Sequence, residues 1–257
     1  MLNAVLSSKS GRLHPDDDQG VRWRDLFRGS EDLLTATVFE RLSYLRAERV
    51  WSLLAYASAG QLPSYKIAVI HDIEFWPMWS SSDRRRGVEP DVFISLDLGD
   101  PAKRVHIIIE AKYGGKQTYT QWRDELLAWK ENYIDDEIKA PELIILLAIG
   151  GSTEINNKIK LKEYICEFAK NEFEISSDFI IAQIEWRDIA RSCSFSQAEN
   201  LHEQRLLSDL KKGLELHGYY HRELPSQMEK IATDLDFENS LDLLRKSNEN
   251  IARSLII

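Results

Sequence analysis

Three ionisable residues near the middle of the chain, Asp91, Glu110 and Lys112, have the types and spacing of a hydrolytic site. Two carboxylates held side by side repel each other, and a divalent cation with oxygen ligands is the usual counter-charge. Mg²⁺ prefers one or two carboxylates with several retained waters, which leaves positions for a phosphate. Such an ion lowers the pKa of its bound water, while a lysine ammonium stabilises developing charge or orients the nucleophile. The combination predicts metal-assisted phosphodiester hydrolysis.

Two apolar segments are expected to position these side chains. Residues 92–96 follow Asp91, and the continuously apolar residues 105–109 precede Glu110, as in a buried central strand. A turn at residues 99–101 would join them as an antiparallel hairpin. Both acids lie equally far from that turn, so a symmetric register brings them opposite each other, with Lys112 on the face of Glu110.

Pro90-Asp91, eighteen intervening residues and then Glu110-Ala111-Lys112 behind an apolar strand resemble the signature of the PD-(D/E)XK nuclease superfamily, which has the restriction-endonuclease-like fold. The resemblance implies that Asp91 and Glu110 bind Mg²⁺, with Mn²⁺ able to substitute, and that Lys112 assists catalysis. Many members carry a glutamine on the helix after the lysine. Gln121 stands at that place, and Gln117 is a weaker candidate one turn earlier.

A further acid, Glu31, lies near the start of a helix predicted from residue 30, with Ser30 as its N-cap. Helical spacing puts Glu31 on the same stripe as the buried Leu34 and Val38, so it is expected to point toward the sheet. Acids on the first helix of the superfamily often approach the metal site, so the resemblance makes Glu31 a candidate metal ligand. The alternative is an acid that only caps the helix end.

The net charge of −9 argues against a protein that coats nucleic acid non-specifically, but local basic contacts remain compatible with a nuclease. Arg84, Arg85 and Arg86 precede the Pro90-Asp91 motif, and Lys116 follows the other motif. They are candidate phosphate contacts, with a solvated basic loop as the alternative. The two cysteines have neither metal-ligand nor redox spacing, which fits a reducing cytoplasm. No apolar run reaches the length of a membrane span.

The order of predicted elements indicates an α/β fold with a mixed sheet, in which an antiparallel hairpin is combined with parallel strands and flanked by helices. Strands are expected at 66–76, in two parts, at 142–149 and at 179–186, and helices at 46–59, 117–133, 155–171 and 197–220. The crossover from the hairpin through 117–133 to 142–149 predicts a parallel pair. This order is that of the superfamily, so the resemblance covers residues 25–190 as a catalytic core, and 191–257 is expected to be a helical C-terminal extension packed on it.

These observations favour a Mg²⁺-dependent nuclease that acts on nucleic acid, with DNA favoured over RNA. The resemblance also implies a place in bacterial restriction or defence against foreign DNA, with a homodimer or a partner protein of a defence system left open. One alternative is a non-catalytic nucleic-acid- or protein-binding scaffold with a nuclease-like fold. Another is an enzyme acting on a small phosphorylated compound, which the acidic charge favours.

Overall fold

The computed structural model describes residues 2–7, 9–10, 21–82, 87–134, 140–151, 159–160, 163–168 and 178–220. All of them lie within one compact unit of the chain, residues 1–221. The helices are α1 (Leu2–Leu6), α2 (Trp23–Gly29), α3 (Glu31–Ser43), α4 (Ala47–Ala57), α5 (Tyr119–Tyr133), α7 (Trp186–Phe195) and α8 (Leu201–Leu216). The strands are β1 (Ala68–Phe75), β2 (Val92–Leu98), β3 (Lys103–Ala111), β4 (Leu143–Ile149) and β5 (Asp178–Ile184).

The five strands form one mixed sheet in the order β1-β2-β3-β4-β5. β1, β2 and β3 pair with one another in antiparallel fashion, whereas β3, β4 and β5 run parallel. The predicted α/β class, the mixed sheet and the central place of β3 are therefore confirmed. The strand expected at 66–76 is β1, and its two apolar parts are separated by a shift in register near residue 71 that does not end its pairing with β2.

The hairpin of β2 and β3 has the predicted register. Val92 pairs with Ile109 and Leu98 with Lys103, so each pair of partners is equally far from the turn. Continued by one residue, this register sets Asp91 opposite Glu110. The chain between the strands turns at Gly99, whose φ of +83° favours glycine.

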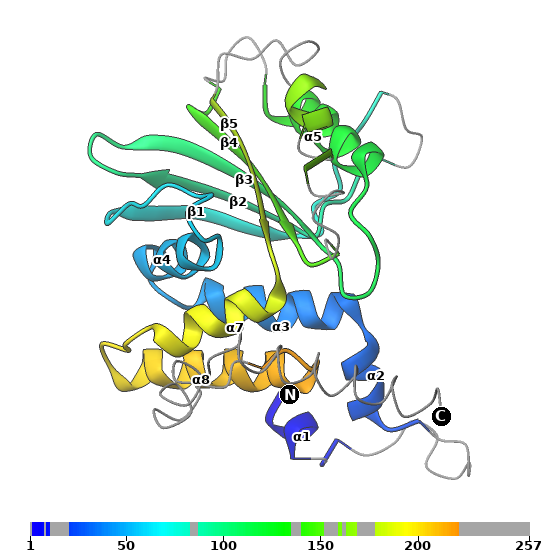
Figure 1. The fold of residues 1–257 in the computed structure, drawn as a ribbon, viewed down its shortest axis with the longest axis vertical. Coiled ribbons are helices and arrows are strands. Elements are labelled where there is room, and N and C mark those ends of the chain that lie inside the picture. The colour runs from blue at the N-terminus through cyan, green and yellow to red at the C-terminus, as the bar shows by residue number, and fades with distance from the viewer. Residues whose placement is uncertain are drawn as a thin grey trace, which may run out of the picture. The chain divides into compact units, whose positions relative to one another are not determined.

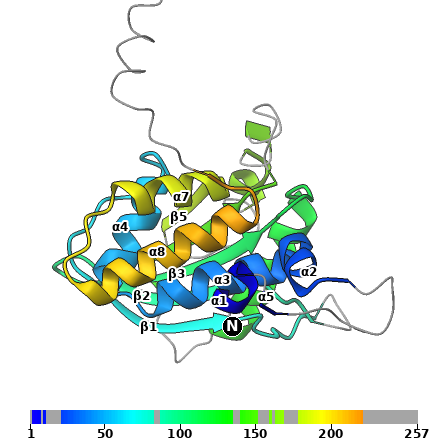
Figure 2. The same ribbon diagram turned by 90° about the horizontal axis from the view of Figure 1, so that it is seen from below.

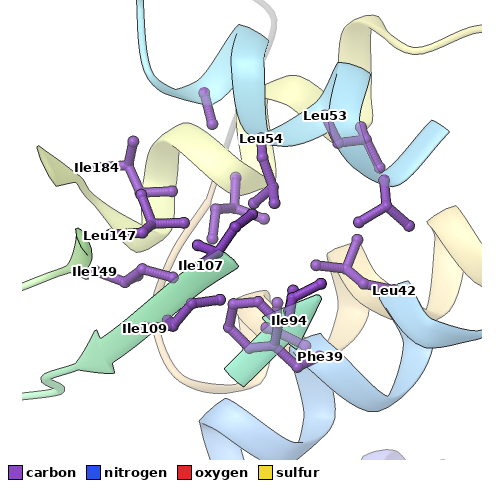
Figure 3. Close-up of a cluster of buried hydrophobic side chains, with 14 of the residues drawn as sticks. Phe39, Leu42, Leu53, Leu54, Ile94, Ile107, Ile109, Leu147, Ile149 and Ile184 are labelled. Carbon is purple, nitrogen blue, oxygen red and sulfur yellow. The ribbon is translucent and has the colours of Figure 1, made fainter. Parts of the chain in front are cut away.

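Helices cover both faces of the sheet. Figure 1 shows α5 on one face and α3, α4, α7 and α8 on the other, and Figure 2 shows these four helices from their own side. Alternate residues of each strand face the two layers: Ile107 and Ile109 of β3 lie in the larger apolar cluster with α3 and α4 (Figure 3), whereas Ile108 lies with α5. Because side chains alternate along a strand, Glu110 is on the α5 face, together with Ile108.

The helices themselves follow their sequence signals. Ser30 accepts a hydrogen bond from the Leu33 amide and caps α3 as predicted. The spacing of apolar residues in 117–133 predicts that Trp122, Leu126 and Trp129 face inward, and all three are fully buried on α5. Where the expected 155–171 helix is described, at 159–160 and 163–168, the residues are helical, and the rest of that prediction lies outside the described residues.

Two details after β4 differ from the prediction. The last strand ends at Ile184, because Trp186 begins α7, a helix that the sequence analysis missed. The leucine spacing of 197–220 predicts a buried stripe of Leu201, Leu206, Leu210 and Leu214. In α8, Leu201 is 60% exposed and Leu206 is half-buried, whereas Leu207, Leu210 and Leu214 are buried. Helix α8 packs on α3, and α7 packs on α4. No helix in the described part of the chain is both long and apolar enough to cross a bilayer.

Candidate active site

The two motif acids meet at the end of the hairpin, on the α5 face of the sheet. Asp91 is 9% exposed and Glu110 is 1% exposed. Oδ2 of Asp91 accepts a hydrogen bond from the backbone amide of Ala111, at 2.7 Å. This bond ties the residue before β2 to the end of β3 and fixes the Asp91 carboxylate beside Glu110.

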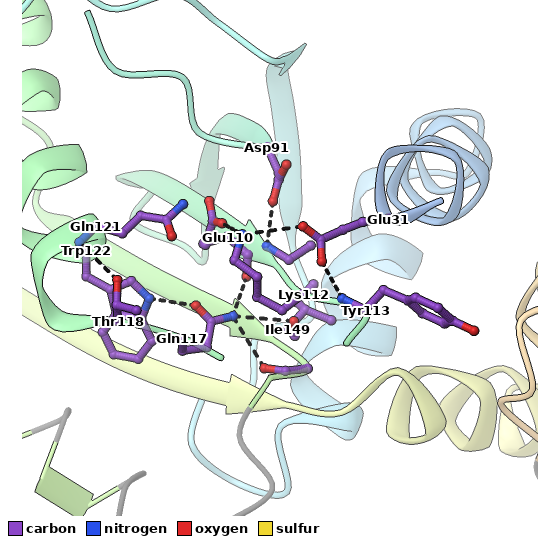
Figure 4. A network of polar contacts seen from close by, with 12 residues as sticks. Glu31, Asp91, Glu110, Lys112, Tyr113, Gln117, Thr118, Gln121, Trp122 and Ile149 are labelled. Carbon is purple, nitrogen blue, oxygen red and sulfur yellow. Dashed lines mark hydrogen bonds and ion pairs between the residues drawn. The ribbon is translucent and has the colours of Figure 1, made fainter. Parts of the chain in front are cut away.

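Lys112 and Glu31 complete the cluster. The Lys112 ammonium contacts Oε1 of Glu110 and lies 3.5 Å from Oε1 of Glu31. The other Glu31 oxygen accepts a hydrogen bond from the Tyr113 amide at 2.6 Å. Figure 4 shows Glu31 reaching the strand end from α3 and Asp91 entering the same cluster from above. The structure thus brings together all four residues that the sequence singled out for the metal centre and its lysine.

Burial and mutual repulsion shift the pKa values of this cluster. Burial, with repulsion from Glu110, raises the pKa of Asp91 to about 7. Burial alone would lower the pKa of Lys112, but its contacts with Glu110 and Glu31 outweigh burial and raise it. Lys112 is therefore a cation at neutral pH, suited to stabilising negative charge and not to accepting a proton.

A fourth acid at the site, Glu125, was missed by the sequence analysis. It lies on α5 and is 1% exposed, and neither carboxylate oxygen accepts a hydrogen bond from a nitrogen or hydroxyl donor of the described residues. Burial, followed by repulsion from Glu110 and a hydrogen bond with the Glu110 side chain, raises its pKa well above the usual range. The signal was present in the sequence: Glu125 falls on the same helical stripe as Trp122 and Leu126, and a charged residue on a buried stripe indicates a special role.

The two candidate glutamines have different surroundings. Gln117 is 5% exposed, and its Nε2 donates to the backbone oxygen of Glu110 at 3.1 Å and to that of Gly150 at 3.3 Å. Its Oε1 accepts from the indole of Trp122 at 2.8 Å. Gln121 lines a pocket of about 360 Å³ with Glu125. Gln117 is therefore a clamp on the ends of β3 and β4, and Gln121 is beside the buried acids.

The backbone of Lys112 is held on both sides. Its amide donates to the Ile149 oxygen at 2.7 Å, and its oxygen accepts from the Trp186 indole at 2.9 Å. A Cβ added at Gly150 would lie 2.2 Å from the Lys112 oxygen, and Gly150 has a φ of +67°. Only glycine fits there without displacing the backbone that carries the lysine.

The candidate phosphate contacts are placed only in part. Arg84, Arg85 and Arg86 lie outside the described residues. Lys116 is exposed and lines a pocket of about 490 Å³ with Tyr113 and Arg187, on the segment that directly follows Lys112. Lys116 is therefore close in the chain to the carboxylate cluster and open to solvent.

The donor set fits a divalent cation. Four carboxylates, those of Glu31, Asp91, Glu110 and Glu125, gather here, and one ammonium, that of Lys112, contacts them. In the described part of the chain, no three His, Cys, Asp or Glu side chains are arranged to hold an ion by themselves. Mg²⁺ requires fewer protein ligands, because it usually binds through one or two carboxylates and keeps several waters. Asp91 and Glu110 would supply those two.

Comparison with known proteins finds a relative of this chain. It is 32% identical over 236 residues to the uncharacterized protein PM0110 of Pasteurella multocida (strain Pm70), a match that covers 87% of this chain and 82% of that protein. The chain belongs to the family of PM0110. No protein-family model matches it. No solved structure matches it significantly.

Proposed function

We propose that this member of the PM0110 family is a metal-dependent nuclease of the PD-(D/E)XK superfamily, with a restriction-endonuclease-like core, that hydrolyses phosphodiester bonds of DNA. The observation that carries the proposal is the gathering of buried carboxyl groups around one ammonium at the end of β3. Among the described residues, Lys112 is the one ammonium that contacts these acids, and the pKa values of Asp91 and Glu125 are raised. Ionising these carboxyl groups in the folded protein therefore costs free energy, which a bound cation would offset.

Each residue of the cluster has a role in this proposal. Asp91 and Glu110 hold Mg²⁺, and Mn²⁺ can substitute. When bound, the ion polarises the phosphate and lowers the pKa of a bound water. Lys112, kept protonated by its two acids, stabilises the charge that develops on the phosphate and orients the attacking water. Glu31 fixes the position of that ammonium, because its two oxygens contact Lys112 and the Tyr113 amide.

The surrounding residues keep this geometry rigid. Gln117 joins the ends of β3 and β4, and Trp186 holds the Lys112 carbonyl. Gln121 and Glu125 lie on the side of α5 and are proposed to order water or the substrate beside the carboxylates. The same proposal includes a role in defence against foreign DNA in the cytoplasm. The protein would act as a homodimer or with a partner protein, because two active sites are the simplest way to cut both DNA strands.

The test is cleavage of supercoiled plasmid and of single-stranded DNA in Mg²⁺, in Mn²⁺ and in EDTA. The wild-type protein is expected to cut with either ion and not in EDTA. Glu110→Gln, which keeps the shape of the side chain, should remove cleavage, while Glu40→Gln on the exposed side of α3 should leave it unchanged. If thermal melts show folded protein and no nucleic acid is cut with any ion, the nuclease proposal is wrong and the non-catalytic scaffold replaces it.

A further inference from the structure

A second pocket lies at the carboxyl ends of the parallel strands, beside the segment that follows Lys112. It has a volume of about 490 Å³ and is lined by residues that follow β3, β4 and β5 and by residues after α8. In open α/β sheets, ligands bind in the crevice outside the carboxyl ends of the strands. The volume lies in the range of small-ligand sites and can hold one nucleotide unit.

The wall of this pocket lies against the side chain of Lys112, the proposed catalytic lysine. A Cβ added at Gly151 would lie 2.8 Å from Cβ of Lys112, and one at Gly115 would lie 3.3 Å from Cδ of Lys112. Gly115 and Gly151 both line the pocket. Tyr113, also in the lining, donates its amide to Glu31 of the cluster. A group in this pocket is therefore one residue layer away from Lys112.

The lining combines aromatic rings with basic side chains and one acid, Glu185, whose carboxylate accepts the Asp188 amide in the capping box of α7. Tyr113, Tyr219 and Tyr220 supply the rings, and Lys116 and Arg187 supply positive charge. Both basic residues are exposed. Proteins that bind single-stranded nucleic acid combine basic side chains along the phosphate backbone with aromatic rings on which bases stack.

Two of the rings are already fixed in place. The rings of Tyr113 and Tyr219 meet edge to face at 6.1 Å, and the hydroxyl of Tyr219 donates to the Tyr113 carbonyl at 3.3 Å. The Trp186 indole also lies against Tyr219, with 6.3 Å between the ring centroids. Tyr220 is the exposed ring of the three, at 53%. Because Tyr113 and Tyr219 are held in place, this part of the wall loses little conformational entropy when a nucleotide binds beside it.

We propose that this pocket binds one unpaired nucleotide next to the scissile phosphate, with its base on Tyr220 and its phosphate between Lys116 and Arg187. The inference rests on the proposed nuclease function and adds the substrate class: a single-stranded segment or a frayed end instead of a continuous duplex. A base inside a duplex has both faces covered by its neighbours and cannot stack on a protein ring.

The test measures binding separately from cleavage. A fluorescein-labelled 15-nucleotide oligothymidine and a blunt duplex of the same length are titrated with protein in EDTA at low salt, and the fluorescence anisotropy is followed. Tyr220→Ala is compared with Tyr44→Ala, which removes an exposed tyrosine outside the pocket. The paired change Lys116→Ala with Arg187→Ala is compared with Lys66→Ala, another exposed lysine outside it. Thermal melts verify that every variant is folded.

Tyr220→Ala and the paired basic variant are each expected to weaken oligothymidine binding about tenfold, with little change for the duplex and none for the two controls. A 4-thiothymidine oligonucleotide should cross-link to a peptide that contains Tyr113 or Tyr220. If the wild-type protein binds or cuts nucleic acid and the pocket variants bind oligothymidine as the wild type does, the inference is wrong and the nuclease proposal stands. If the wild-type protein neither binds nor cuts any nucleic acid, both are overturned.

Discussion

Replacing Asp91 by asparagine is expected to stabilise the metal-free protein at alkaline pH, although it removes a proposed metal ligand. Asp91 is buried beside Glu110 and accepts the Ala111 amide through Oδ2. The side-chain oxygen of asparagine can accept the same hydrogen bond. The substitution therefore removes the charge and its repulsion but keeps the shape and the backbone contact.

The size of the expected stabilisation follows from the shift in the pKa of Asp91. The pKa of Asp91 rises from 3.8 to about 7 in the folded protein, chiefly through burial. At about 1.4 kcal/mol for each pH unit, this difference corresponds to about 4 kcal/mol of lost stability at high pH. We expect about half of it, roughly 2 kcal/mol, because the cluster titrates jointly and asparagine accepts a weaker hydrogen bond. For a protein of this size, that is about 6 °C in Tm.

The direction of the Asp91 pKa shift sets the pH range in which the stabilisation should appear. Between pH 4 and 7 the folded protein holds a proton on Asp91 that the unfolded chain has released, so the stability contributed by this group falls as the pH rises. The advantage of Asp91→Asn over wild type should therefore be near zero at pH 4 and reach its full size by pH 8. Thermal and urea denaturation in EDTA across this range measure it.

A control with the opposite sign is available at the other end of the same strand. The hydrogen bond from Arg104, with a further one from His71, lowers the pKa of Asp97. Asp97→Asn should therefore destabilise the protein at pH 8. If Asp91→Asn is equal to wild type or less stable at pH 8 in EDTA, then Asp91 is not held in repulsion with Glu110, and the argument from buried charge is refuted.

Three further predictions concern the residues that support the cluster. Gln117→Leu should lower the free energy of unfolding by about 2 kcal/mol and remove most cleavage, because the backbone oxygens at the ends of β3 and β4 lose the Gln117 amide as a donor. Urea denaturation measures the first effect, and the plasmid assay measures the second. Gly150→Ala should be strongly destabilised or fail to fold, because its Cβ would collide with the Lys112 carbonyl. Gly114→Ala, whose new Cβ has no atom within 4 Å, should have the melting temperature of the wild type. Equal melting temperatures for the two variants would contradict the packing described. Burial lowers the pKa of His106 to about 4, so the folded protein loses stability as the pH falls from 6.5 to 4. His106→Gln should reduce that loss by about 2 kcal/mol, measured by acid denaturation. If the loss of stability in acid is unchanged in the variant, the ring is protonated in the folded state.

The sequence contained most of what determines the hairpin. The apolar runs of β2 and β3 and the turn between them fix the register, because a slip by one residue would move every buried side chain to the other face. The proximity of Asp91 and Glu110 follows from that register alone. Glu31 was also predictable, since helical spacing places it on the buried stripe of α3.

Other features of the site depend on contacts that local patterns do not encode. The closeness of Glu125 to Glu110 results from the packing of α5 on the sheet, and the clamp made by Gln117 depends on the crossover to β4. Leucine spacing alone places Leu201 on the buried stripe of α8, but the Asn200 cap puts it in the first turn of the helix, where it is exposed to solvent. Periodicity indicates which face of a helix is apolar, but tertiary packing decides how far along the helix that face is covered.

The central claim is that Asp91 and Glu110 hold a divalent cation, and a crystal soaked in Mn²⁺ tests it most directly. The claim predicts an anomalous difference peak within about 2.2 Å of a carboxylate oxygen of both residues, with the Lys112 ammonium displaced from Glu110 but still beside Glu31. No peak at that place at saturating Mn²⁺, with Lys112 still paired to Glu110, would contradict it.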